Sequence, residues 1–291
     1  MKPSFGYKAM EGVMRLLKTR NRMLKDAANG EQRNELPKGK LAKRWTRAEF
    51  EGRAVWMCHP AGGKTKRVYV HQHGGGYVYG LLGLHFMSLS ELCDYADMTV
   101  ILPDYPLPPQ AHAPEIMDWA DRHFASVVEC YGLENVALGG CSAGGNLALA
   151  ILQKRAGRGD SNPDTIALWS PWLKLTPAET PPTKADDYEA VITPFGLEPA
   201  VGAYLGDSGV DRADPLISPI FADVRALPTL NIVTGAKDIL HPAIAEFAET
   251  AKAADRLGDY YVEPEYGHYW MFYPLKDRHP TLKRIAGWLS A

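Results

Sequence analysis

Short apolar runs rich in β-branched and aromatic residues recur along the chain from residue 48 onward. Glycine, proline or polar residues bound each run, which is the pattern of β-strands separated by turns. Several runs are almost wholly apolar, as strands buried on both faces of a sheet are. We therefore expect strands within residues 48–60, 67–73, 98–105, 135–141, 165–173, 229–235 and 260–266.

Between some of these runs the apolar positions follow the period of an α-helix. Residues 113–131 carry Ile116, Trp119 and Val127 near the 3.6-residue spacing, and residues 244–257 form a second such segment. Strands that alternate with helices indicate a mainly parallel sheet covered by helices on both faces. The expected fold class is therefore α/β, with a mostly parallel central sheet.

The 291 residues, 46% of them hydrophobic, can bury the core of one large domain, with or without an appendage. A formal net charge of −2 speaks against a nucleic-acid partner. The charge is uneven, because residues 1–50 hold 13 lysines and arginines against 5 acidic residues. We expect this N-terminal segment to be distinct from the body of the protein, residues 51–291.

Residues 7–25 place methionine, leucine and valine at roughly helical spacing with basic residues between them, which predicts an amphipathic helix. Its apolar face can pack on the body of the protein or lie on a membrane surface, and Glu11 and Asp26 favour packing because they interrupt the basic face. No run of about 18 apolar residues occurs, so we expect no stable membrane insertion. The four cysteines lack C-x-x-C spacing, which indicates reduced thiols and a soluble, cytoplasmic protein.

One long segment interrupts the alternation of strands and helices. Residues 176–215 are polar and rich in proline, with helical spacing only around residues 198–205. Long connections in compact domains are usually functional, so the segment is expected to be a lid or a substrate-shaping insertion. A solvated loop is the alternative.

The sequence GCSAG, residues 140–144, lies between an apolar run and a helix-forming run. It matches the G-x-S-x-G pattern of a nucleophilic serine on a sharp strand-to-helix turn. The residues two positions before and after the serine must be small so that strand and helix can approach each other. Backbone N–H groups at the start of the helix favour a developing negative charge. Ser142 is therefore the candidate nucleophile.

The stretch VHQHGGGYVYG, residues 70–80, places three glycines after His73 at the end of a predicted strand. An HGGG-type loop completes the oxyanion hole of lipases and esterases that carry a G-x-S-x-G turn. A tetrahedral intermediate needs N–H donors within about 3 Å of its oxyanion, and glycines let the backbone come that close. A plain glycine-rich turn is the alternative.

A serine nucleophile needs a base and an acid that orients the base, in the chain order Ser, Asp/Glu, His. Among the three histidines after Ser142, His279 heads a predicted terminal helix and His241 follows Asp238 too closely to be its partner across the site. His268 lies just beyond the last strand and is the candidate base. Asp238, at the end of an apolar strand, is the candidate acid, and a helix N-cap is the alternative role for it.

These motifs resemble the hormone-sensitive-lipase-like esterases of the α/β-hydrolase superfamily. The similar stretches, in chain order, are HGGG (73–76), DYPLPP (104–109), GCSAGGN (140–146), SPWLKL (170–175), DPLISPIFAD (214–223) and the surroundings of Asp238 and Gly267-His268. The resemblance covers residues 51–291. It implies an α/β-hydrolase domain with a helical cap, built from residues 1–50 and from the insertion at about 176–215 after the sixth strand.

The resemblance also implies roles near the nucleophile. Gly75 and Gly76, together with Ala143, are expected to donate the oxyanion N–H groups. His73 is expected to hold the loop and not to act as a base.

Cys141 precedes the candidate nucleophile, and we do not expect Cys141 to be a nucleophile itself, because the turn exposes the next residue. Tyr269 and Trp270, directly after the candidate base, suggest a narrow acyl or alcohol pocket.

The function expected from these residues is hydrolysis of short-chain carboxylic esters through an acyl-enzyme, with Ser142, His268 and Asp238 as the catalytic triad. An amide hydrolase and a non-catalytic small-molecule receptor on the same fold are the alternatives. Neither a metal nor an organic cofactor is implied. The expected partner is a small-molecule ester, and a homodimer is left open.

Overall fold

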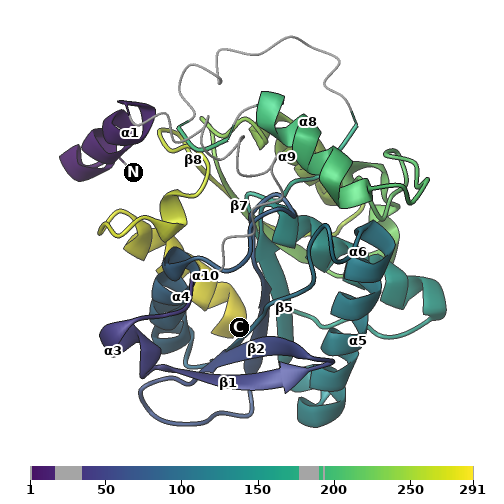
Figure 1. The fold of residues 1–291 in the computed structure, drawn as a ribbon, viewed down its shortest axis with the longest axis horizontal. Helices are drawn as coiled ribbons and strands as arrows, with labels where there is room; N and C mark the ends of the chain where they lie inside the picture. The colour runs from purple at the N-terminus through teal and green to yellow at the C-terminus, as the bar shows by residue number, and fades with distance from the viewer. Residues whose placement is uncertain (1, 17–34, 177–189, 193, 291) are drawn as a thin grey trace.

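A computed structural model describes residues 2–16, 35–176, 190–192 and 194–290. Its centre is an eight-stranded sheet in the order β1-β2-β4-β3-β5-β6-β7-β8 (Figure 1). All neighbouring pairs from β4 to β8 are parallel, whereas β1 pairs with β2 and β2 with β4 in antiparallel fashion. The predicted mainly parallel sheet is confirmed. The strands are β1 (Trp45–Phe50), β2 (Arg53–Cys58), β3 (Val68–Gln72), β4 (Thr99–Pro103), β5 (Val136–Cys141), β6 (Ile166–Trp169), β7 (Leu230–Gly235) and β8 (Leu257–Glu263).

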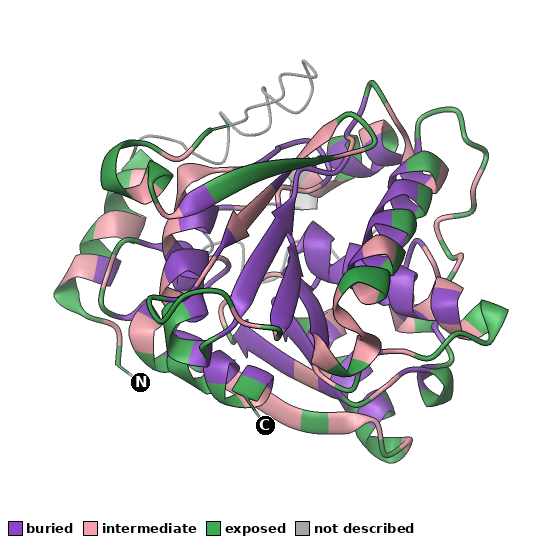
Figure 2. Ribbon diagram, turned by 90° about the horizontal axis from the view of Figure 1, so that it is seen from below, coloured by how far each residue is buried: buried purple, intermediate pink, exposed green. Residues whose placement is uncertain are grey.

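Helices cover both faces of the sheet, as predicted (Figures 1 and 2). One face carries α5 (Ala113–Tyr131), α6 (Ala143–Arg158) and α9 (His241–Ala253), and the other carries α4 (Gly83–Ala96) and α10 (Arg278–Ser290). Shorter helices are α3 (Gly39–Ala42) and four single 3₁₀ turns, η1 (Leu133–Asn135), η2 (Pro219–Phe221), η3 (Val224–Ala226) and η4 (Trp270–Phe272).

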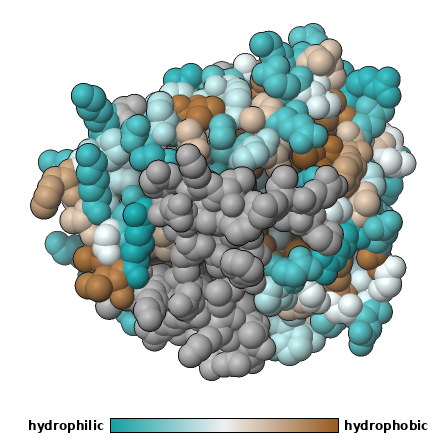
Figure 3. All heavy atoms as spheres, turned by 90° about the horizontal axis from the view of Figure 1, so that it is seen from above, coloured by the Kyte–Doolittle hydropathy of each residue, from teal (hydrophilic) through white to brown (hydrophobic). Residues whose placement is uncertain are grey.

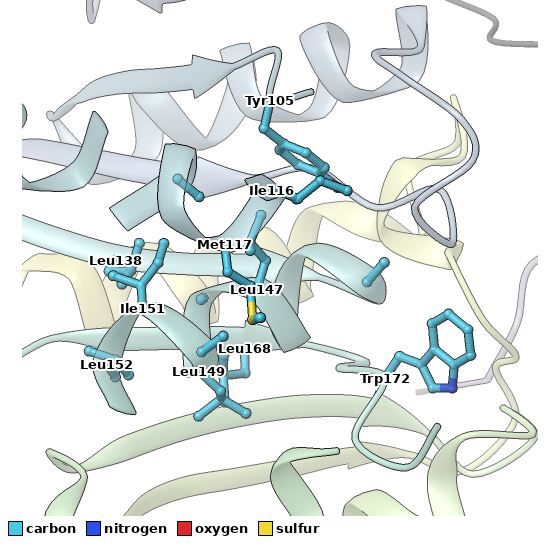
Figure 4. Packing of buried hydrophobic residues seen from close by; sticks show 14 of the residues in the cluster. Tyr105, Ile116, Met117, Leu138, Leu147, Leu149, Ile151, Leu152, Leu168 and Trp172 are labelled. Atoms are coloured by element: carbon cyan, nitrogen blue, oxygen red, sulfur yellow. The ribbon is translucent and has the colours of Figure 1, made fainter. Parts of the chain in front are cut away.

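Two hydrophobic cores lie on the two faces because successive side chains of a strand point to opposite sides. Val70 of β3 belongs to the core under α5 and α6, whereas its neighbour Tyr69 belongs to the core under α4 and α10. In the first core, Leu138 of β5 packs with Met117 of α5 and Ile151 of α6 (Figure 4). Residues of β5, β7 and β8 pack into these cores, and the candidate site lies at the carboxyl ends of these strands.

Several predicted boundaries were wrong. The strand expected over residues 165–173 is β6, which ends at Trp169, and the strand expected over residues 260–266 is β8, which ends at Glu263. Residues 48–60 were expected to form one strand, but Glu51 and Gly52 take positive φ angles of 45° and 77° and turn the chain into the β1-β2 hairpin. The helix expected over residues 244–257 is α9, which ends at Ala253. Leu257 already begins β8.

The two predicted cap segments are described in part. The N-terminal amphipathic helix is α1 (Phe5–Leu16), and residues 17–25 of its predicted range lie outside the described residues. In the insertion, the helix expected over residues 198–205 is α8 (Pro194–Leu205), while residues 177–189 and 193 lie outside the described residues.

Both helices lie at the carboxyl edge of the sheet (Figure 1). The surface on this side of the molecule carries both hydrophilic and hydrophobic side chains (Figure 3). The side chains of Phe5, Val13 and Leu16 of α1 are exposed. In the described part of the chain, no helix is long and apolar enough to cross a membrane.

Candidate active site

Ser142 occupies the sharp turn between β5 and α6, which is the strand-turn-helix context that the sequence predicts. Its backbone angles, φ 53° and ψ −120°, are strained for a residue other than glycine. The turn is held from β6, since the Ser142 N–H donates to the Trp169 carbonyl at 2.9 Å. The Ser142 carbonyl in turn accepts the Trp172 N–H at 2.9 Å. These two backbone hydrogen bonds stabilise the strained turn.

The two glycines of the G-x-S-x-G pattern are required by close backbone contacts. A Cβ atom on Gly140 would overlap the carbonyl oxygen of Gly144, and one on Gly144 would overlap the carbonyl oxygen of Gln72. The serine turn therefore lies directly against the end of β3, where the glycine loop begins. This confirms the steric reason given for the small residues around the serine.

Asp238 and His268 meet at the same edge of the sheet. Asp238 follows β7, His268 follows β8, and both strands run parallel to β5, whose end carries Ser142. The Nδ1 atom of His268 lies 2.7 Å from Oδ2 of Asp238, and each residue is only 1% exposed. The other carboxylate oxygen, Oδ1, accepts the Leu240 N–H at 2.9 Å. Asp238 thus tightens the turn before α9 and still holds the histidine.

The glycine loop after β3 has a backbone that only glycine adopts easily. Gly75 and Gly76 have φ angles of 126° and 62°, and a Cβ atom on Gly75 would overlap the carbonyl oxygen of Tyr79. The N–H groups of Val78 and Tyr79 fold back onto the Gly75 carbonyl at 3.1 Å and 2.9 Å. The amides of Gly75, Gly76 and Ala143 make no backbone hydrogen bond to any other described residue outside regular helices and strands. These amides are the candidate donors to an oxyanion.

His73 is buried beneath this loop and does not face the acid. Its Nδ1 atom lies 2.7 Å from the Gly74 carbonyl oxygen, and its ring stacks on Tyr105 with centroids 4.0 Å apart and planes 9° apart. The Tyr105 hydroxyl donates to the His73 carbonyl at 2.8 Å. Burial lowers the pKa of His73 to about 4. This is the geometry of a neutral ring that holds the loop.

The candidates rejected from the sequence, Cys141, His241 and His279, have surroundings that differ from those of His268. Cys141 is buried, and burial raises the pKa of its thiol to about 12, so it is protonated at neutral pH. His241 begins α9, with its backbone N–H donating to the Asp238 carbonyl at 3.0 Å, and burial lowers the pKa of its imidazole. The His279 side chain is 37% exposed and lies 3.5 Å from Glu91.

Tyr269 has a different position from the one its place in the sequence suggested. Its hydroxyl lies 3.3 Å from Nε2 of His85 and 3.9 Å from Sγ of Cys141. A Cβ atom on Gly74 would overlap this hydroxyl. Tyr269 therefore packs against the glycine loop at Gly74, with its hydroxyl between this glycine, His85 and Cys141.

Sequence analysis missed Asn146, a polar group that supports the site. Asn146 lies one turn after Ser142 on α6 and is fully buried. It accepts the Tyr77 hydroxyl at 2.6 Å and donates to the carbonyls of Trp172 and Ile217 at 2.9 Å and 2.8 Å. A polar residue on the inner face of an otherwise apolar helix was the signal that could have identified it.

The residues covered by the structure contain no cluster of three or more histidine, cysteine or acidic side chains able to hold a metal ion. The site itself comprises a serine on a strained turn, a buried histidine-carboxylate pair and the amides of the glycine loop.

Comparison with known proteins agrees with this arrangement. A model of the alpha/beta hydrolase fold matches residues 69–272. An esterase of Acinetobacter venetianus is 32% identical over 186 residues, which are 64% of this chain and 61% of that protein. An acetyl-hydrolase of Streptomyces hygroscopicus is 30% identical over 218 residues, covering 74% of this chain and 70% of that one. The crystal structure of a hormone-sensitive lipase from a metagenome library superposes with a TM-score of 0.79 at 25% identity, covering 94% and 90% of the two chains.

The chain belongs to the α/β-hydrolase fold family. The resemblance to hormone-sensitive-lipase-like esterases, which rested on the sequence motifs alone, is confirmed by these matches. The chain spans less than two thirds of the Acinetobacter esterase.

Proposed function

We propose that the protein is a serine carboxylesterase that hydrolyses short-chain acyl esters through an acyl-enzyme intermediate. The observation that carries this proposal is the buried contact between His268 and Asp238, at the sheet edge where Ser142 occupies its strained turn. The names of the two relatives, an esterase and an acetyl-hydrolase, support the same chemistry.

In the first half of the reaction, Ser142 Oγ attacks the ester carbonyl carbon while His268 Nε2 takes the hydroxyl proton. The carbonyl oxygen becomes an oxyanion, and the amides of Gly75, Gly76 and Ala143 stabilise it. When the tetrahedral intermediate collapses, the bond to the alcohol oxygen breaks. The alcohol leaves with the proton from His268, and the acyl group stays on Ser142.

In the second half, water attacks the acyl-enzyme and gives its proton to His268. Collapse of this intermediate releases the carboxylic acid and returns the proton to Ser142. Asp238 keeps the imidazole in the tautomer with hydrogen on Nδ1 and stabilises the imidazolium formed in each half. The contact of 2.7 Å between the two side chains is short, as expected of a charge-assisted hydrogen bond.

Large aromatic side chains around the site support a preference for short acyl groups. Tyr77 and Tyr79 follow the glycine loop, Trp270 follows the base, and all three are buried. We expect rings this close in the chain to the proposed oxyanion glycines and to the base to leave little room for a long acyl chain.

We also propose that the site is covered by a cap, that the protein is cytoplasmic and that its partner is a small molecule. Residues 1–50 and about 176–215 would form the cap over the site, and α1 and α8 at this edge support that assignment. The four cysteines are free thiols, which supports a cytoplasmic location. The partner would be a small-molecule ester and not a nucleic acid.

The test is a panel of aryl esters of graded acyl length, with the matching anilides and with Ser142→Ala as the control. The proposal expects ester turnover that Ser142→Ala abolishes, and anilides that react much more slowly. Anilide turnover as fast as ester turnover would identify an amide hydrolase, and no turnover of either would point to a receptor.

A further inference from the structure

The peptide unit that joins Tyr266 to Gly267, one residue before His268, is held from both sides. Its carbonyl, that of Tyr266, accepts the N–H of Lys237 at 3.0 Å, from the loop that carries the acid. Its N–H, that of Gly267, donates to the hydroxyl oxygen of Tyr7 at 3.0 Å. Tyr7 belongs to α1 and lies 260 positions away in the sequence. The N-terminal helix therefore makes a direct hydrogen bond to the loop that carries the proposed base.

The Tyr7 hydroxyl is fixed for this contact. It donates its proton to Oε1 of Glu11 at 2.7 Å, so the Gly267 N–H meets an oxygen lone pair. Tyr7 is 1% exposed, and its ring packs on Tyr266 and Tyr273 with centroids 4.5 Å and 5.7 Å away. Burial raises the pKa of Tyr7 well above its ordinary value, so the hydroxyl stays protonated.

The first turn of α1 has a second anchor that does not involve Gly267. The backbone N–H and the hydroxyl of Ser4 donate to the two oxygens of Asp277 at 2.7 Å and 2.6 Å. Asp277 also accepts the hydroxyl of Tyr266 at 2.8 Å. The Ser4 hydroxyl also accepts the backbone N–H of Tyr7 at 3.1 Å, so this anchor is coupled both to Tyr7 and to Tyr266, and a control for helix packing has to lie elsewhere on α1.

Tyr7 and Lys237 leave the Tyr266–Gly267 peptide little freedom to rotate. Rotation of that peptide would move the Cα atom of His268 and change the angle at which Nδ1 meets Asp238. Imidazole orientation decides proton transfer, and misplacement on the scale of 1 Å can cost about 100-fold in rate. A buried N–H that loses its acceptor also destabilises the conformation that holds it.

We propose that Tyr7 is a positioning residue for His268, which makes the alignment of the base depend on docking of the N-terminal helix. The proposal rests on the function proposed above. It assigns to the N-terminal segment a role beyond covering the site, because one of its side chains completes the hydrogen bonding of the catalytic loop.

The test is Tyr7→Phe, which keeps the ring and removes only the hydroxyl. The expected result is a kcat about tenfold lower on a short-chain aryl ester, with KM little changed. The acid limb of the profile of kcat/KM against pH should move to lower pH, because a less well aligned Asp238 stabilises the imidazolium less. The rate at which a fluorophosphonate phosphonylates Ser142, with fluoride as leaving group, should fall in parallel.

The matched control is Met14→Ala, which removes apolar packing of α1 on the body of the protein but leaves the hydrogen bonds of Tyr7 in place. Its thermal stability should fall as in Tyr7→Phe, while its kcat and acid limb stay at the wild-type values. Wild-type kcat and an unmoved acid limb in Tyr7→Phe would overturn the proposal. So would a Met14→Ala variant that reproduces both changes. A wild-type protein that neither turns over esters nor reacts with the fluorophosphonate would instead contradict the proposed function.

Discussion

Tyr204 of α8 stacks face to face on Tyr77 of the glycine loop, with ring centroids 3.7 Å apart and planes 6° apart. Tyr77 also contacts α6, because its hydroxyl donates a hydrogen bond to Asn146, one turn after the proposed nucleophile. On the other side of the site, Tyr7 of α1 contacts the loop of His268. Each of the two helices proposed to belong to a cap, α1 and α8, thus contacts a different loop of the proposed catalytic machinery, so we expect these helices to influence catalysis as well as substrate access.

Replacing Tyr204 tests the contact with the glycine loop. Tyr204→Ala removes a buried ring and should cost about 3 kcal/mol of unfolding free energy. Because Tyr77 then loses the ring that holds it, kcat/KM should fall as well, by about tenfold. Tyr204→Phe keeps the stack and should retain both properties. Denaturant unfolding and steady-state kinetics on the three proteins check this. A Tyr204→Ala variant with wild-type kcat/KM would show that the stack serves stability alone.

Cys141 is expected to be chemically inert despite its position next to the nucleophile. It is buried and its thiol pKa is raised to about 12, so it carries almost no thiolate at neutral pH. Cys130 is exposed and serves as the internal control. Iodoacetamide treatment of the folded protein, followed by peptide mass spectrometry, should find Cys130 modified and Cys141 intact. Cys141→Ala should retain most of the activity, and a large loss would assign Cys141 a role that burial does not explain.

Acid should destabilise the protein through its buried histidines. Burial lowers the pKa of His123 to about 4 and that of His71 to about 3, against about 6.5 in the unfolded chain. As pH falls from about 6.5 towards 4, the unfolded state binds protons that the folded state does not, so stability falls. His123→Phe removes one such group and should reduce the loss of unfolding free energy between about pH 7 and about pH 4.5 by on the order of 2 kcal/mol.

The burial argument fails if His123→Phe and the wild type unfold with the same midpoint in an acid titration followed by tryptophan fluorescence.

Acyl length tests the proposed crowding of the site by aromatic side chains. Esters from acetate to about butyrate should give the highest kcat/KM, and long-chain emulsified lipids should be poor substrates, because the buried rings of Tyr77 and Tyr79 directly follow the proposed oxyanion glycines and are expected to limit the space for an acyl chain. Rates on p-nitrophenyl esters of increasing length check this. A maximum at about eight carbons or longer would show that the pocket extends past these rings.

Much of this architecture could be predicted from local patterns in the sequence. The range of α5 matches the predicted helix over residues 113–131, because its apolar positions follow a single face. Gly140 and Gly144 could be predicted because they belong to the G-x-S-x-G pattern, although the contact that requires Gly144 is with the distant Gln72. The pairing of His268 with Asp238 could be predicted because parallel strands bring their carboxyl ends to one edge.

Other features depend on contacts between distant parts of the chain. Nothing local to Tyr7 indicates a hydrogen bond to Gly267, 260 residues away. The direction of Tyr269 was not predictable either, since it depends on the space left by Gly74. The β1-β2 hairpin was missed because Glu51, which is not a typical turn residue, takes a positive φ there.

The most direct measurement of the central claim compares Ser142→Ala, His268→Ala and the double variant with the wild type on one short-chain aryl ester. Each single change should lower kcat by on the order of 10⁴-fold or more, and the double variant should be little worse, because the two side chains act as one unit. Asp238→Asn should cost less than Ser142→Ala but still orders of magnitude, and His241→Ala should retain most activity. An active His268→Ala protein together with an inactive His241→Ala protein would contradict the assignment of the base.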